Sequence, residues 1–151
     1  MAVWPVGTAL SRSAIAYPLV NAAHILALAM VVGAISALDL RVLGLYRTTA
    51  LDDLARPLSG LAAVGVAAAL ITGFLLFSVR PTLYAGNPAF LIKVGLVALG
   101  ILNALGLRAN PHWRRALAGA PIHASVKLTA AASLLIWAGA VIAGRWIAFT
   151  E

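Results

Sequence analysis

The chain has 151 residues, of which 63% are hydrophobic and only 10% are charged. A soluble domain is closer to half apolar and needs more charge to cover its surface, so this composition excludes a soluble globular protein and predicts one integral membrane domain. The absence of cysteine excludes disulfides, thiolate chemistry and Cys-ligated metals. The net charge of +7 could indicate nucleic acid, but the basic residues lie mostly at the ends of apolar runs. We therefore attribute them to membrane topology and expect no nucleic-acid partner.

The first residues lack the positive start of a secretory signal, so we expect no cleaved targeting peptide. Trp4 and Tyr17 should instead lie at headgroup level. Beyond them, each apolar segment of about 20 residues can cross a bilayer as a helix. Four segments qualify: 18–38, 58–77, 88–107 and 126–147.

The connections between these segments are short, so neighbours in sequence should pack antiparallel. We predict a single all-α transmembrane domain over residues 1–151, folded as an up-down-up-down four-helix bundle. Asn87 and Pro88 have the residue types of an N-cap and a first helical residue for the third span. Pro57 precedes the second span and Pro18 opens the first.

Small residues recur at a spacing of four in every span, and such stripes let membrane helices approach closely. They are Ala29, Gly33 and Ala37; Gly65, Ala69 and Gly73; Gly100 and Ala104; and Gly139 and Ala143. We interpret them as packing positions of a tight bundle.

Positive charge marks the cytoplasmic side of a membrane protein. One side of the predicted bundle holds Arg41, Arg47, Arg56, Arg108, Arg114, Arg115 and Lys127, and the other holds Arg12, Arg80, Lys93 and Arg145. The side with seven basic residues is therefore expected to be cytoplasmic. Both termini lie on the other side, which for a bacterial inner membrane is the periplasm. On the cytoplasmic side, Asp39 beside Arg41 and Asp53 three residues before Arg56 should form structural ion pairs at the membrane surface.

Four basic or titratable side chains fall in one outer layer, each from a different span: His24, Arg80, Lys93 and Arg145. Glu151 is the only acidic residue on that side. An ionisable group in the bilayer is costly unless it is paired, hydrated or able to reach the headgroups. Lys93 and Arg145 could extend outward, and a neutral His24 could bond to Asn21 or to a carbonyl. The alternative is an anionic or metal-containing ligand that compensates the positive charge of these side chains.

The fourth span carries polar residues on one face, at multiples of four from Thr129 through Ser133 and Trp137 to Arg145. Trp137 at mid-membrane suits a flat aromatic ligand, but it suits ordinary core packing better. Asn103 and Thr72 could add hydrogen bonds to such a pocket or to each other.

Most of the chain from Tyr17 to Phe149 resembles a family of short, uncharacterised four-helix bacterial inner-membrane proteins. The segments that carry the resemblance are HILALAMVVGAISALDLRVLG, ITGFLLF, NPAFLIKVGLVALGILNAL and SLLIWAGAVIAGRWIAF. That family has no settled function.

A more distant similarity is to copper-resistance D-type membrane domains and HemJ-type protoporphyrinogen oxidases. Those proteins also combine a histidine early in the first helix, as His24 does here, with F-x-x-K opening a later helix, as Phe90 and Lys93 do. The resemblance implies that His24 is an axial ligand of haem b and that Lys93 contacts a propionate or the substrate. The chain departs from the cytochrome b pattern, because His112 and His123 belong to the opposite side of the membrane.

The leading hypothesis is therefore a small haem-associated or redox-linked membrane protein with a single-histidine site in the outer leaflet, formed by His24, Lys93, Arg145, Arg80 and Trp137. Whether it is an enzyme stays open. The alternative is a cofactor-free component that binds a membrane-protein partner or a second copy of itself. Copper handling at His24 comes third, because soft Cu(I) prefers Cys or Met and Met30 lies on another face.

Overall fold

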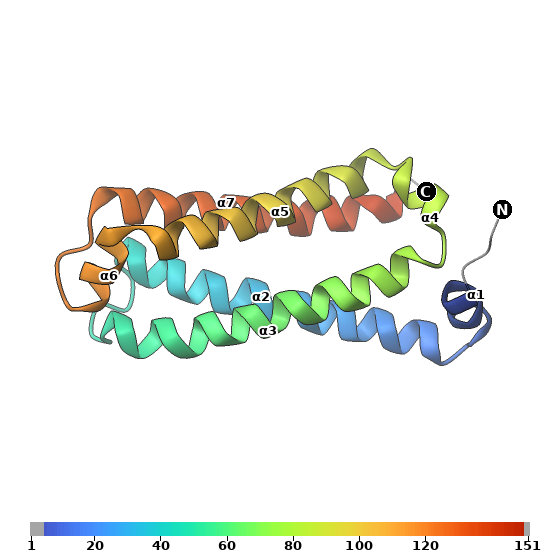
Figure 1. The fold of residues 1–151 in the computed structure, drawn as a ribbon, viewed down its shortest axis with the longest axis horizontal. Helices are drawn as coiled ribbons and strands as arrows, with labels where there is room; N and C mark the ends of the chain where they lie inside the picture. Colours follow the sequence, from blue (N-terminus) through green and yellow to red (C-terminus); the bar gives the residue numbers. More distant parts are fainter. Residues whose placement is uncertain (1–4, 150–151) are drawn as a thin grey trace.

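The computed structural model describes residues 5–149, and Trp4 and Glu151 lie outside this range. Within it the chain is all-α, and its four long helices, α2 (Ala16–Leu43), α3 (Leu51–Phe77), α5 (Pro88–Ala109) and α7 (Ala124–Trp146), form an antiparallel bundle (Figure 1). The shorter elements are α1 (Pro5–Arg12), α4 (Pro81–Ala85), α6 (Pro111–Leu117) and the 3-10 turn η1 (Ile147–Phe149). The four long helices are long and apolar enough to cross a membrane, which agrees with a multi-pass membrane protein.

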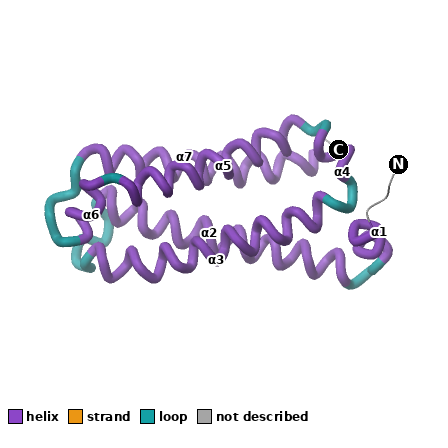
Figure 2. Tube along the Cα trace, viewed as in Figure 1, coloured by secondary structure: helices purple, strands orange, loops and turns teal. Residues whose placement is uncertain are grey.

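The bundle has two distinct ends. One end carries α6 and the α2–α3 connection, and the other carries α1, α4 and the last turn of α7 (Figure 2). We call them the α6 end and the α4 end. Each of the four predicted spans is confirmed as a long helix.

Local signals account for several helix boundaries. Asn87 caps α5 as predicted, because its side chain accepts hydrogen bonds from Ala89 N at 2.9 Å and Phe90 N at 3.4 Å. Gly44 ends α2 in the left-handed region at φ 114°, and the N–H of the following residue bonds back to Leu40 O at 2.9 Å. The expected boundary at Pro57 is wrong, because α3 already begins at Leu51 and carries Pro57 inside it.

The helices do not pack equally around the bundle. α2 packs along α3 on one side and α7 on the other, and α5 packs along α7. α3 and α5 are consecutive spans but make no extensive contact in the described chain, because α4 and its flanking loops carry the chain across the bundle. The face between α3 and α5 is therefore the open side of the bundle.

Most of the buried core lies toward the α6 end. It combines residues of α2, α3, α6 and α7: Leu38, Val42, Leu51, Ala55, Trp113, Ala116, Val126 and Ala130. α6 contributes the buried Trp113 and leaves Arg114 and Arg115 exposed. The four long helices also expose many large apolar side chains, as expected for contact with lipid.

Small residues mediate the close helix contacts. A Cβ at Gly65 would lie 2.8 Å from Val31 Cγ2, and one at Gly100 would lie 2.9 Å from the Trp137 ring. Both glycines therefore lie where a neighbouring helix approaches closely, as predicted. Gly33 is different, because it is exposed and a Cβ there would meet nothing within 4 Å.

Candidate functional site

His24 and Lys93 lie together in the half of the bundle nearer the α4 end. Lys93 Nζ is 3.5 Å from His24 Nε2, although the two residues are 69 positions apart in the chain. Both side chains are half-buried. The sequence placed them in one layer, and the structure brings them into direct contact.

The other ring nitrogen of His24 is held by α3. His24 Nδ1 lies 2.8 Å from Thr72 Oγ1, and the Thr72 hydroxyl is 2.6 Å from the carbonyl oxygen of Ala68. The hydroxyl has one proton, which it donates to Ala68 O, so it accepts from His24 Nδ1–H. The lone pair of His24 therefore resides on Nε2 and faces the Lys93 ammonium. His24 also has a backbone hydrogen bond to Ala69, so a carbonyl is among its partners, as the sequence analysis allowed, and Thr72 is a partner that it did not foresee.

Glycines on two helices make room for this pair. A Cβ at Gly73 of α3 would lie 3.1 Å from His24 Cε1, so the imidazole packs directly on that helix. A Cβ at Gly144 of α7 would lie 3.4 Å from Lys93 Cδ, Cε and Nζ, so the lysine stem runs along the bare face of α7. All four long helices thus contribute to the site. Sequence reasoning missed the role of Gly144, because it falls outside the spacing-four stripe of α7.

An aromatic cluster fixes the start of α5 and with it the position of Lys93. The Phe90 ring stacks on Phe77 with centroids 5.5 Å apart, and Tyr84 lies 5.6 Å from Phe90. These rings join α3, α4 and α5 one helical turn before Lys93. The F-x-x-K spacing therefore places an anchoring ring and a cation on successive turns.

The other three predicted site residues lie apart from His24 and Lys93. They are Arg80, Trp137 and Arg145. Arg145 is exposed and its guanidinium lies 5.1 Å from the centroid of the Phe149 ring. Arg80 lies beyond the end of α3 and lines a separate cavity. Trp137 is only 4% exposed and packs against Gly100, as an ordinary core residue does.

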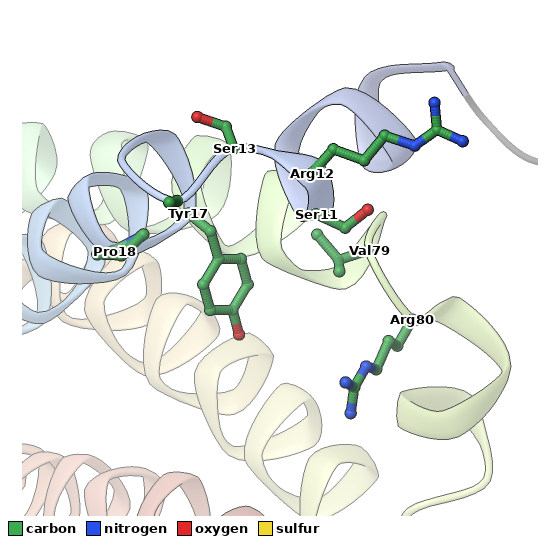
Figure 3. A pocket seen from close by; sticks show the side chains of 8 residues that line it. Ser11, Arg12, Ser13, Tyr17, Pro18, Val79 and Arg80 are labelled. Carbon is green, nitrogen blue, oxygen red and sulfur yellow. The ribbon is translucent and has the colours of Figure 1, made fainter.

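The Arg80 cavity lies at the α4 end and has a volume of about 710 Å³. Its lining comes from α1, the start of α2 and the residues after α3, and includes Arg12, Tyr17 and Arg80. Figure 3 shows Tyr17 and Arg80 pointing to the same side, whereas the Arg12 guanidinium extends away from them. Tyr17 precedes His24 by two turns on α2 and so shares its face, roughly 10 Å along the axis.

The acidic residues do not pair as the sequence suggested. Arg56 pairs with Asp52 at 3.2 Å rather than with Asp53, because four residues is one turn of the helix. Arg41 donates from Nε to Thr49 O at 2.8 Å and not to Asp39. Asp39 is instead buried at 4% exposure, where the Ser133 side chain hydrogen-bonds to its carboxyl group.

Other polar residues bond within the α6 half of the bundle. Asn103 Nδ2 donates to Thr129 O at 3.1 Å, which links α5 to α7. Thr72 and Asn103 therefore have separate partners and do not bond to each other. His112 and His123 stack with ring centroids 4.0 Å apart at the α6 end, far from His24. Within residues 5–149, no group of three or more His, Asp or Glu side chains could hold a metal ion.

No known family model matches the chain, and no curated protein or solved structure is recognisably similar to it. The resemblance to the copper-resistance D-type and HemJ-type proteins stays a prediction that rests on the His24 and F-x-x-K spacing.

Proposed function

We propose that the protein is a small bacterial inner-membrane protein that binds haem b through His24, with Lys93 as the partner of an anionic group of the cofactor. The observation that carries this proposal is the Thr72 hydrogen bond to His24 Nδ1. Histidines that ligate metals almost always donate their second ring N–H to a fixed acceptor, which orients the ring and leaves the other nitrogen for the metal. His24 has this arrangement, and its other ring nitrogen, Nε2, faces Lys93 Nζ.

The residues at the site fit haem in their chemistry. One imidazole nitrogen suffices as a protein ligand, because the porphyrin supplies the others. No carboxylate of the described chain lies within 4.0 Å of Lys93, so the lysine is available to a propionate. Iron bound at His24 Nε2 would replace the contact of this nitrogen with Lys93, and the lysine could then pair with a propionate. Bound there, haem would supply one-electron chemistry.

The cavity at the α4 end is separate from the His24 site, because neither His24 nor Lys93 lines it, but it offers space for a small molecule at the same end of the bundle. Its volume of about 710 Å³ is within the range of small-molecule sites, and Arg80 gives it a positive charge. The copper hypothesis has less support, because the chain has no cysteine and the described residues hold no group of three or more His, Asp or Glu side chains that could bind a metal ion.

The proposed topology places the α4 end at the periplasmic face. The α6 end carries seven Lys and Arg residues and the α4 half carries four, and the richer end faces the cytoplasm in membrane proteins. Both termini are then periplasmic, and the His24 site lies in the outer half of the bilayer.

The second candidate function is a cofactor-free membrane component that binds protein partners or a second copy of itself. The direct contact between Lys93 and His24 favours it, because the two side chains satisfy each other without a guest. In that case the pair is structural, and the removal of either side chain lowers stability without any spectral effect.

The haem-to-protein ratio of matched variants tests the proposal. The parent, His24→Ala, His112→Ala and Lys93→Met are expressed with ample haem and purified in one detergent. We expect His24→Ala to lose haem and Lys93→Met to retain less than the parent. His112→Ala should keep the parental ratio, because this histidine lies at the α6 end. Full haem loading in His24→Ala would overturn the assignment of the ligand.

A conservative substitution of Lys93 distinguishes two roles for this residue: contact with the cofactor, or extension of its side chain to the lipid headgroups. Lys93→Arg keeps the positive charge but replaces a compact ammonium with a broad planar fork. If Lys93 contacts the cofactor, arginine should not restore haem retention or the parental spectrum. If the Lys93 side chain only extends to the headgroups, Lys93→Arg should behave like the parent.

A further inference from the structure

A second cavity lies in the half of the bundle nearer the α6 end, apart from the His24 site. It has a volume of about 360 Å³ and opens on the side where α3 and α5 make no extensive contact. Leu70 of α3 and Leu105 of α5 line it and are 54% and 55% exposed. Because exposed apolar residues of these helices face lipid, the cavity is accessible from the hydrocarbon phase.

Asp39 is the one acidic residue that lines this cavity. Its side chain lines the cavity, is 4% exposed, and lies 15 residues after His24 on α2, about 22 Å along the helix. Ser133 satisfies one part of the carboxyl group. Across residues 5–149, Asp39 Oδ2 is the only buried side-chain nitrogen or oxygen without a hydrogen-bond partner. Buried polar groups are normally satisfied, so this oxygen is available to a donor from outside the protein.

Two indole rings line the same cavity. Trp113 of α6 and Trp137 of α7 are 6% and 4% exposed. Tryptophan faces attract cations, most strongly where water is excluded. A carboxylate oxygen and two indoles in one apolar cavity are the groups that recognise an ammonium ion.

We infer that this cavity binds a small lipophilic amine, with its ammonium group on Asp39 Oδ2 and its apolar body between α3 and α5. Ser59, Asn103 and Ser133 supply the uncharged polar side chains of the lining, and Arg108 is its one basic residue. Arg108 is exposed and lies in the last turn of α5, so it can extend to the headgroups and away from the buried carboxylate. The site is independent of haem binding at His24, so either can fail without the other.

Three probes that differ only in their polar head test the inference: 4-phenylbutylamine, 4-phenylbutan-1-ol and 4-phenylbutyrate. Each is titrated calorimetrically into the purified protein, and titration into protein-free micelles is subtracted. We expect the amine to bind at least tenfold more tightly than the alcohol or the acid. Equal affinity of amine and alcohol would overturn the role of the carboxylate, and preference for the acid would assign the site to Arg108 and an anion.

Matched variants locate the site. Asp39→Asn keeps the side-chain shape but removes the charge, and we expect it to weaken amine binding at least tenfold while alcohol binding stays unchanged. Asp53→Asn is the control, because Asp53 is exposed near the same end and lines no part of this cavity. Parental amine affinity in Asp39→Asn would contradict the proposal.

A second variant keeps the test decisive if Asp39→Asn does not fold. Ala67 lines the cavity from α3 and is exposed, so Ala67→Phe fills the cavity without disturbing the buried core. We expect it to lose binding of the amine while its haem content and melting temperature stay parental. Unchanged amine binding in Ala67→Phe would place the amine elsewhere.

Discussion

Gly65→Ala measures directly how closely α2 and α3 approach. The added Cβ would lie 2.8 Å from Val31 Cγ2 and 3.1 Å from both Ala27 O and Val31 N. Two of these three neighbours are backbone atoms of α2, so they cannot move without shifting the helix. Overpacking of this kind costs about 1–3 kcal/mol of unfolding free energy.

Gly60→Ala in the same helix is the matched control, because a Cβ at Gly60 meets nothing within 4 Å. Both substitutions gain about 0.5–1 kcal/mol from replacing a helical glycine. This gain cancels in the comparison, so Gly65→Ala should be less stable than Gly60→Ala by the overpacking cost of about 1–3 kcal/mol. Far-UV circular dichroism during titration with a denaturing detergent gives the two values.

Val31→Ala should lower the unfolding free energy less in the Gly65→Ala background than in the parent, because it relieves the contact of the added Cβ with Cγ2 and leaves the two backbone contacts. If both glycine variants change the unfolding free energy equally, α2 and α3 do not approach at Gly65 and the described helix arrangement is incorrect.

Two further predictions concern topology and capping. Reporter fusions after Gly119 should behave as cytoplasmic and fusions after Glu151 as periplasmic, and the opposite pattern would place the His24 site in the inner leaflet. Asn87→Ala should lower the unfolding free energy by about 0.5–2 kcal/mol, because the Asn87 side chain accepts from two N–H groups at the start of α5. An unchanged unfolding curve for Asn87→Ala would show that these bonds contribute nothing to stability.

The sequence determined the local features of the fold well. Runs of about 20 apolar residues can be recognised without tertiary information, and the Asn87–Pro88 pair marked the start of α5 correctly. Pro57 misled the prediction for α3, because a proline in the second turn of a helix can resemble a start signal. The true start at Leu51 places Asp52 and Asp53 in the first turn, where negative charge is favourable.

The site was predictable only in part, for reasons of long-range packing. The common depth of His24 and Lys93 followed from counting residues along two helices. Their contact, and the bond from His24 to Thr72, depend on the rotation of three helices about their axes, which the sequence pattern does not fix. The burial of Asp39 was missed for the same reason, since its proximity to Arg41 in sequence suggested an ion pair at the surface.

Haem content of the unmodified protein is the measurement that tests the central claim most directly. The parent is expressed with ample haem supply, purified as a folded monodisperse species, and assayed for haem b against protein concentration. The account predicts one haem per chain, with a Soret band that disappears in His24→Ala. A folded, colourless parent would contradict haem binding at His24 and would leave its contact with Lys93 as a structural pair of the bundle.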